Sequence, residues 1–210
     1  MDELGNLLAG YRRFREFRYE AEKSRWRALA EGQSPRAIVI ACCDSRADPA
    51  TIFDTDPGEI FVVRNVANLV PPFEGGGGRH GVSAALEFAI TQLGVGEVIV
   101  MGHERCGGIQ AALTGQFHDA PNGEGGFVAN WMSQIDEPAA KIAAAHGTGE
   151  DAARILEEVA IRQSLTNLRT FPFVAERQEI GTLKIIGCHF SISEGRLYLL
   201  DEAEDVFRPV

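Results

Sequence analysis

The chain has 210 residues, of which 30 are acidic and 20 are basic, so its formal net charge is -10. With 45% hydrophobic and 24% charged residues, the composition is that of an ordinary globular protein and excludes disordered, fibrous and coiled-coil proteins. A chain this acidic repels phosphate backbones, so no nucleic acid is expected as a partner.

The cysteines and the apolar segments bear on the compartment. Four cysteines are too few for a secreted disulfide scaffold, and they are not evenly spaced. The N-terminus has no basic segment, and no apolar run approaches the roughly 18 residues that a membrane span needs. We therefore expect a soluble cytoplasmic protein that does not contact a membrane.

Residues 1–31 predict an amphipathic helical arm. Apolar side chains recur there at intervals of three and four, with Arg and Glu between them: Leu4, Leu7, Leu8, Tyr11, Phe14 and Phe17. Such a stripe needs a surface to cover. It packs either on its own domain or on a partner subunit.

The rest of the chain alternates between apolar runs and helical patterns. Short β-branched runs predict buried parallel strands at 37–41, 60–63, 98–101 and 183–186, and helical patterns lie at 82–93, 127–145 and 152–168. This alternation predicts an α/β fold in which a mostly parallel central sheet carries helices on both faces. We expect one domain over 1–210, with its α/β core at 37–201.

Two polar segments follow predicted strands directly. Residues 42–46 (CCDSR) follow the strand at 37–41, and residues 102–108 (GHERCGG) follow the strand at 98–101. The carboxyl ends of neighbouring parallel strands meet at one sheet edge, so thiols from both segments and the imidazole of His103 are expected to converge.

Two sulfurs and one imidazole nitrogen form a ligand set that suits Zn²⁺, and three protein ligands leave a fourth position open for catalysis. Cys42 and Cys43 cannot easily both face a metal, because neighbouring side chains at a strand end point to opposite sides. One of them is expected to be a packing residue. Cys188 and His189 also follow a strand, but nothing partners them in spacing, and we interpret them as core.

These segments resemble the paired zinc motifs of the β-class carbonic anhydrases. The likeness covers residues 30–201 and includes Cys42–Arg46, His103–Gly108, Pro57–Val70, Ser164–Thr170 and Gly187–Leu197. The resemblance implies that Cys42, His103 and Cys106 bind zinc, since Cys42 is the first residue of the C-x-D-S-R motif and Cys43 is its variable position.

The resemblance also implies an activity and the residues that carry it. The expected reaction is the reversible hydration of CO₂ to bicarbonate and a proton by zinc-bound hydroxide. Asp44 is expected to accept a hydrogen bond from that hydroxide, while Arg46 holds the Asp44 carboxylate in place. Zinc-bound water has a pKa near 7 in such sites, which makes the reaction possible at neutral pH.

By position, the substrate pocket is expected to combine an apolar wall with a few hydrogen-bond donors: Gln33, Phe61, Val66, Phe88 and Gly107. The family completes this pocket across a dimer interface, so a homodimer or a larger homo-oligomer such as a tetramer is expected. His80 and His118 titrate near neutrality but lie in loop-like surroundings, and we assign neither a role.

Members of the family differ in whether a second, non-catalytic bicarbonate site closes the enzyme. Those that have it resemble one another in a Trp, an Arg and a Tyr, whereas this chain has Val39, Arg64 and Phe190 at these positions. Without the indole N–H and the hydroxyl, bicarbonate loses two hydrogen bonds, each worth about 1 kcal/mol. We predict an open resting site without cooperative bicarbonate inhibition.

Alternatives differ in how well the sequence excludes them. Zinc deaminases need H-x-E with P-C-x-x-C, and zinc alcohol dehydrogenases need a dinucleotide motif; the chain has neither pattern. Hydrolysis of a CO₂-like heterocumulene such as carbonyl sulfide remains open on the same fold. So does a structural zinc module in which Asp44 closes the fourth metal position.

Overall fold

The computed structural model describes residues 3–76 and 78–210, and the chain divides into two compact units. The first comprises residues up to Ser34, and the second runs from Pro35 to Val210. The prediction that both form a single domain stays a prediction.

The N-terminal unit is helical, as its apolar spacing predicts. Helix α1 (Glu3–Arg13) continues through a π-helical turn at Phe14–Tyr19, and α2 (Lys23–Glu31) follows. Within the unit, Trp26 packs edge-on against Phe14 and stacks with Tyr19, at ring-centroid distances of 5.4 Å and 6.1 Å. The apolar stripe stays largely exposed, with 61% of Leu4, 72% of Leu7 and 64% of Phe17 accessible to solvent.

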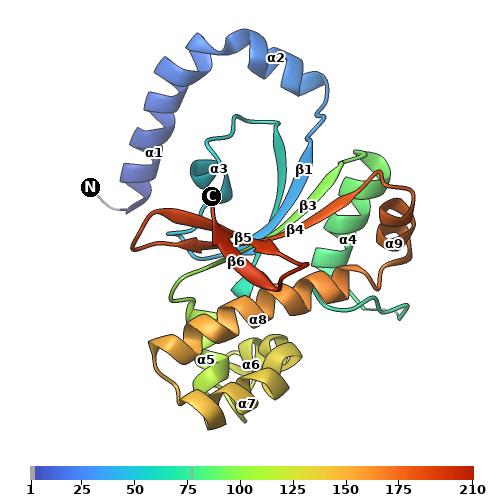
Figure 1. Cartoon of the computed structure of the whole chain (residues 1–210). Helices are drawn as coiled ribbons and strands as arrows, with labels where there is room; N and C mark the ends of the chain where they lie inside the picture. Colours follow the sequence, from blue (N-terminus) through green and yellow to red (C-terminus); the bar gives the residue numbers. More distant parts are fainter. Residues whose placement is uncertain (1–2, 77) are drawn as a thin grey trace. The chain divides into compact units, whose positions relative to one another are not determined.

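The second unit is built on a six-stranded sheet in the order β2-β1-β3-β4-β5-β6 (Figure 1). Neighbouring strands from β2 to β4 are parallel, and β5 and β6 add antiparallel. The strand bounds are β1 Ala37–Cys42, β2 Ile60–Asn65, β3 Glu97–His103, β4 Lys184–Ser191, β5 Arg196–Asp201 and β6 Val206–Pro209. The four parallel strands confirm the strands that were predicted from the apolar runs.

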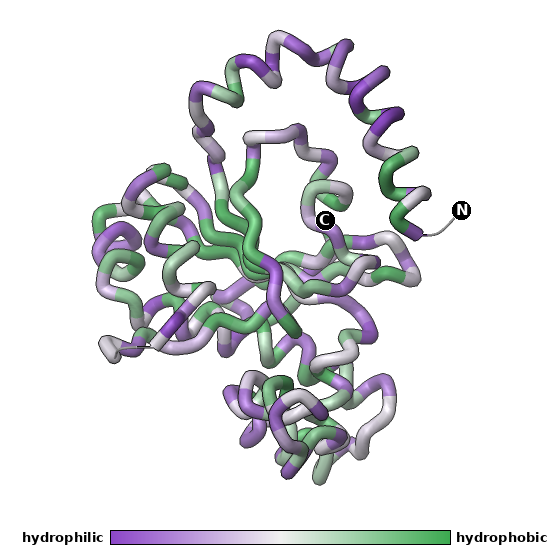
Figure 2. The backbone as a smooth tube through the Cα atoms, turned by 180° about the vertical axis from the view of Figure 1, so that it is seen from behind, coloured by the Kyte–Doolittle hydropathy of each residue, from purple (hydrophilic) through white to green (hydrophobic). Residues whose placement is uncertain are grey.

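The central strands are apolar on both faces, and Figure 2 shows them as the hydrophobic centre of the unit. On one face, Ile38, Ile40, Val98 and Val100 pack against α4 (Gly81–Glu87), α8 (Glu150–Leu168) and α9 (Pro172–Glu179). On the other face, Val39, Ala41 and Met101 pack near the short helix α3 (Pro49–Ile52). Helices on both faces confirm the predicted α/β class.

The helical pattern predicted over 127–145 is interrupted in the structure. Helix α6 (Gly126–Met132) ends in a 3₁₀ turn at Ser133–Ile135, and α7 (Asp136–His146) then begins anew. Pro138 explains the break, because its ring lacks an N–H and clashes with the carbonyl of the residue four positions earlier in a continuous helix. The pattern at 82–93 is likewise divided, into α4 and a π-helical turn at Phe88–Gln92.

Helix α8 joins two layers of the unit. Its first half packs with α5 (Gly107–Thr114), α6 and α7, and its second half packs on the sheet (Figure 1). Gly102 and Gly187 allow this approach: a Cβ added to Gly102 would lie 2.8 Å from Ile161 Cδ1, and one added to Gly187 would lie 2.9 Å from Ile161 Cγ2. Among residues 3–76 and 78–210, no helix combines the length and the apolar character that crossing a bilayer requires.

Candidate metal centre

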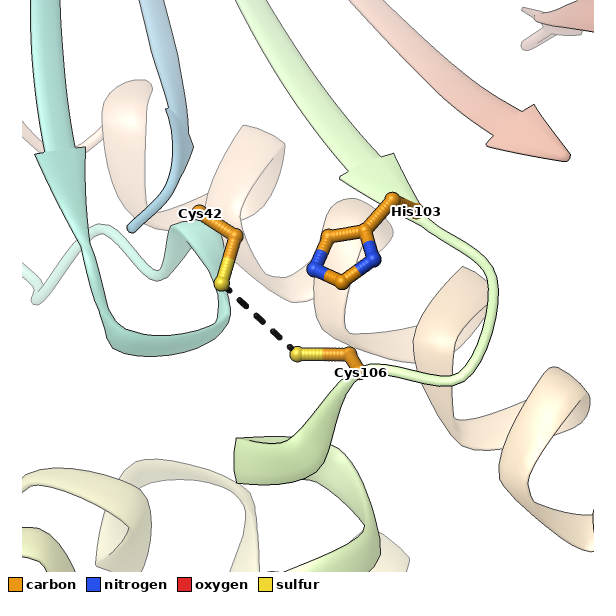
Figure 3. Close-up of side chains that lie close together, drawn as sticks. All are labelled: Cys42, His103 and Cys106. Carbon is orange, nitrogen blue, oxygen red and sulfur yellow. Dashed lines mark hydrogen bonds between the residues drawn. The ribbon is translucent and has the colours of Figure 1, made fainter. Parts of the chain in front are cut away.

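Three side chains predicted to converge do so at the carboxyl ends of β1 and β3. Cys42, His103 and Cys106 each offer one ligand atom, and these atoms all lie within 4.8 Å of one another (Figure 3). The Sγ atoms of Cys42 and Cys106 are 3.8 Å apart. All three residues are buried, with exposed fractions of 6%, 1% and 2%. In the part of the chain that the structure describes, this is the one cluster of three or more such ligands.

His103 presents one ring nitrogen to the cluster without a partner. Its Nδ1 lies 2.9 Å from the backbone oxygen of Glu104, which can only accept, so Nδ1 carries the proton. The buried Nε2 has no hydrogen-bond partner. Its lone pair is therefore free for a metal beside the two sulfurs, and a second partner on Nδ1 is the usual arrangement for a metal-binding imidazole.

The backbone around the cluster is held in uncommon conformations. Arg105, between the two ligands of the second segment, has a φ of 53°, and Ala67 has a φ of 62°. That turn directs the Ala67 N–H toward Cys42 Sγ, at 3.4 Å. The Asn65 side chain spans this turn: its amide N–H donates to Leu69 O at 2.9 Å, and its oxygen accepts from Leu69 N at 3.0 Å. Such conformations persist only where the surroundings hold them, as they do beside these sulfurs.

The two sulfurs influence each other's protonation. The hydrogen bond from the Cys106 thiol lowers the pKa of Cys42, while the same contact and burial raise the pKa of Cys106. Thiolates are the form that binds metals. Cys42 is therefore the sulfur that ionises first.

Asp44 and Arg46 form a two-pronged ion pair beside the cluster. Arg46 Nε donates to Asp44 Oδ1 at 2.9 Å, and Arg46 Nη2 donates to Oδ2 at 2.7 Å. These bonds hold the pKa of Asp44 well below its usual range. Arg46 Nη2 also donates to Arg105 O at 3.0 Å, which links the two ligand segments. Asp44 Oδ2 lies 3.9 Å from His103 Nε2, so the carboxylate faces the ligand cluster.

Arg64 braces the first ligand segment from the neighbouring strand β2. Its Nε donates to Cys42 O at 2.9 Å, Nη2 donates to Asp44 O at 2.6 Å, and Nη1 pairs with Asp48 Oδ2 at 3.0 Å. Sequence reasoning assigned Arg64 only to a bicarbonate site. In the structure its guanidinium holds the loop that carries Cys42 and Asp44.

Comparison with known proteins agrees with this geometry. The carbonic anhydrase family model matches residues 37–197. The chain belongs to the β-class carbonic anhydrases.

Curated relatives and a solved structure give the extent of the likeness. The chain is 37% identical over 204 residues to a carbonic anhydrase of Pseudomonas aeruginosa, covering 96% of this chain and 90% of that one. It is 36% identical to the mitochondrial beta carbonic anhydrase 6 of Arabidopsis thaliana, covering 92% of this chain and 66% of that protein. The structure of the β-carbonic anhydrase CcaA superposes with a TM-score of 0.90 at 29% identity, with both chains fully covered (100%).

The predicted pocket residues of this carbonic anhydrase lie on several elements, and two of them are in contact. The rings of Phe61 and Phe88 are in contact, with centroids 6.0 Å apart, and 45% of Phe88 is exposed. Val66 is half-buried beside the Cys42 loop, and Trp131 Nε1 donates to its carbonyl at 2.8 Å. Gly107 is exposed at the first turn of α5. Gln33 is exposed and belongs to the N-terminal unit, so its contact with substrate stays a prediction.

The remaining cysteines and histidines take no part in the cluster. Cys43 is exposed, whereas Cys188 and His189 are fully buried in β4. His118 is exposed and pairs with Asp119 at 2.9 Å. His80 is half-buried before α4.

Sequence reasoning missed one functional candidate, Glu157 in α8. Only 3% of this residue is exposed, and it lies behind Cys106. The signal was a single carboxylate on a helix face that is otherwise apolar, with Ala153, Leu156, Ala160 and Ile161 around it.

Proposed function

We propose that this carbonic anhydrase uses zinc, held by Cys42, His103 and Cys106, to hydrate CO₂ reversibly to bicarbonate and a proton. The observation that carries the proposal is the buried His103 Nε2 without a partner beside two thiols. Two sulfurs bound tetrahedrally at about 2.3 Å from zinc lie about 3.8 Å apart. Cys42 Sγ and Cys106 Sγ are separated by 3.8 Å, so the two sulfurs already have the spacing that this ion needs.

Three protein ligands leave one tetrahedral position for the reacting water. When bound, zinc supplies a Lewis acid that lowers the pKa of such a water to about 7. The protein residues then decide how that water is oriented and how CO₂ approaches it.

Asp44 and Arg46 are proposed to orient the attacking water. Asp44 Oδ2 faces the cluster and accepts a hydrogen bond from the water, which aims the oxygen lone pair at carbon. The bidentate pair with Arg46 fixes the carboxylate and keeps it away from the metal ligands. This arrangement is the one expected for an open resting site.

CO₂ is apolar and bicarbonate is an anion, so the pocket needs an apolar wall and a few donors. Phe61, Val66 and Phe88 are proposed as the wall. The Gly107 N–H at the start of α5 and the Gln33 amide are proposed as donors to bicarbonate.

We also propose that the enzyme is a homodimer or a larger homo-oligomer, in which Gln33 and Phe88 complete a neighbour's pocket. The exposed stripe of α1 and the exposed apolar side chains near the sheet edge, Val62 and Phe88, support this assembly. Sedimentation at assay concentration is expected to show at least a dimer. A fully active monomer would contradict the assembly.

The cytoplasm is the proposed location, because a reducing compartment keeps the ligand thiols available to a metal.

Stopped-flow CO₂ hydration with zinc quantified in the same sample tests the function. About one zinc per chain and rapid hydration that is lost on metal removal are expected. Stoichiometric zinc without hydration would instead indicate a structural zinc module. Turnover of carbonyl sulfide in place of CO₂ would assign the heterocumulene hydrolase activity.

A further inference from the structure

Glu157 is a buried carboxylate whose place needs explanation. It lies at the middle of α8, where the helix passes from the α5–α7 layer to the sheet. A carboxylate that leaves water is strongly destabilised unless hydrogen bonds replace its hydration. Ile161, one turn later, lies close to Gly102 and Gly187, so the glycines bring this part of α8 against the end of β3 and the middle of β4.

Both oxygens of Glu157 have a partner. Oε1 accepts from the backbone N–H of Cys106 at 3.1 Å. Oε2 lies 2.9 Å from His189 Nε2 in β4, and His189 is fully buried. One carboxylate therefore joins the segment of the proposed metal ligand Cys106 to the neighbouring strand.

A third residue, Arg154, lies against the buried imidazole of His189. Arg154 Nη1 lies 2.5 Å from His189 Nδ1 and 3.0 Å from Nε2. A carboxylate only accepts hydrogen bonds, so Nε2 carries the proton that it donates to Glu157 Oε2. Burial lowers the pKa of His189, in agreement with a neutral ring. His189 thus donates to Glu157, and the guanidinium of Arg154 packs against the same imidazole.

The hydrogen bond between Glu157 and the Cys106 N–H lies where the backbone changes direction. Arg105 turns the chain with a positive φ, and Cys106 then starts α5. The direction of the Cys106 side chain is set by this backbone, and the hydrogen bond from the Cys106 N–H to Glu157 ties it to α8. Residues that form a hydrogen bond with a metal-binding residue commonly tune the affinity for the metal.

We propose that Glu157 is a positioning residue that holds Cys106 in its zinc-binding direction, and that His189 and Arg154 hold Glu157. This inference rests on the proposed function, since it takes Cys106 as a ligand. A carboxylate satisfies both contacts at once, because Glu157 faces an N–H donor on each side in this tautomer of His189. With His189 in this tautomer, an amide in either orientation would set its own NH₂ against one of these donors.

The test uses the full chain with Glu157→Gln, which keeps the size of the side chain. Zinc affinity is measured by competition with a colorimetric chelator, and the cobalt-substituted protein is examined by absorption spectroscopy. We expect zinc binding to weaken by about 10- to 100-fold and the thiolate-to-cobalt charge-transfer band to weaken or shift. At saturating zinc, kcat is expected to fall while KM for CO₂ stays near the parent value.

Leu165→Val is the matched control. Leu165 is buried in the same helix two turns later and packs in the core beside the sheet, so its truncation destabilises the fold without touching Cys106. It is expected to lower the melting temperature and to leave zinc affinity and the cobalt spectrum unchanged. Equal losses of zinc affinity in Leu165→Val and Glu157→Gln would show that Glu157 acts only through stability.

His189→Gln provides a second variant should Glu157→Gln fail to fold. It leaves the contact between Glu157 and Cys106 possible but removes the imidazole that holds the carboxylate, so a smaller loss of zinc affinity is expected. Parent-like zinc affinity and cobalt spectra in these variants would overturn the positioning role while the parent enzyme stays active. A parent protein that binds no zinc would overturn both proposals.

Discussion

The two ligand segments lie at the same edge of the sheet but are held in different ways. Residues 42–48 are fastened from the solvent side, by the half-buried Arg64 of β2 and by the ion pair of Asp44 with the largely exposed Arg46. The segment from His103 to Cys106 is fastened from the interior by Glu157 on α8, and Arg46 reaches it only through the Arg105 carbonyl among the contacts described above. The polar groups proposed to orient the reacting water thus lie on the accessible segment. The buried segment supplies two of the three proposed ligands.

Loss of a proposed ligand is expected to give the largest effect, on either segment. Cys42→Ser and His103→Ala should lose zinc, and hydration should fall to the background rate, because an unbound water has a pKa near 15.7 instead of about 7. Metal content and stopped-flow hydration measure this.

Cys43→Ser is the matched control for Cys42→Ser, since Cys43 is the exposed neighbour. It should keep both zinc and activity. Zinc retained by Cys42→Ser and lost by Cys43→Ser would reverse the assignment within the first segment.

Changes at the accessible pair should separate metal binding from turnover. Asp44→Asn and Arg46→Ala are expected to keep zinc and to lose about 100-fold or more in kcat, because the attacking water loses its orientation. Near-normal hydration by either variant would refute the orienting role.

The pH dependence of the hydration rate tests whether Arg46 positions Asp44 or controls its protonation. Arg46 lowers the pKa of Asp44, so its removal should let that pKa rise toward the ordinary value of about 3.9. Asp44 then still stays ionised above pH 6. The midpoint of the pH–rate profile of Arg46→Ala should therefore match that of the parent, and a shifted midpoint would mean that Arg46 acts on protonation instead of position.

Arg64→Lys should give a smaller effect that is confined to the first segment. A lysine cannot reach Cys42 O, Asp44 O and Asp48 together, so we expect about 2 kcal/mol less stability and about 10-fold lower hydration. Denaturant unfolding and stopped-flow hydration measure both. Arg36→Lys, at an 83% exposed side chain paired with Glu59, is the control and should change stability by less than about 0.5 kcal/mol.

Bicarbonate should have the smallest effect. Val39 is fully buried and Phe190 half-buried, and neither offers a hydrogen-bond donor, while Arg64 is engaged by the first segment. We expect activity to fall on adding bicarbonate only as simple product inhibition. A sigmoidal loss, or a crystal structure near pH 7 to 8 with Asp44 on the metal, would show a closed state.

The sequence was most informative where a residue's role follows from its place along a strand. The runs that form β1 to β4 are continuously apolar, and Cys42, His103 and Cys106 follow two of them, so their convergence could be predicted. Strand β6 could not be predicted, because its exposed residues show no clear alternation. The break at Pro138 could be recognised in retrospect.

Roles that depend on contacts between distant segments could not be predicted from the sequence. Glu157 and Cys106 are separated by 51 positions, and their contact exists only because α8 packs closely on β3 and β4. The bracing role of Arg64 likewise depends on the pairing of β1 with β2, which places Asn65 beside Cys42. Residue type alone marked both side chains as polar but did not indicate what they hold.

The close passage of α8 over Gly102 and Gly187 has a consequence for how this enzyme tolerates variation. Neither glycine is a proposed ligand, yet a methyl group at either position would meet Ile161 at under 3.0 Å and displace the helix that carries Glu157. Replacing either glycine by alanine adds only one methyl group, yet it would then weaken metal binding by displacing Glu157. If every residue is substituted in turn and zinc retention is measured, substitutions of Gly102 and Gly187 should reduce zinc retention about as much as substitutions of residues that hydrogen-bond to the proposed ligands.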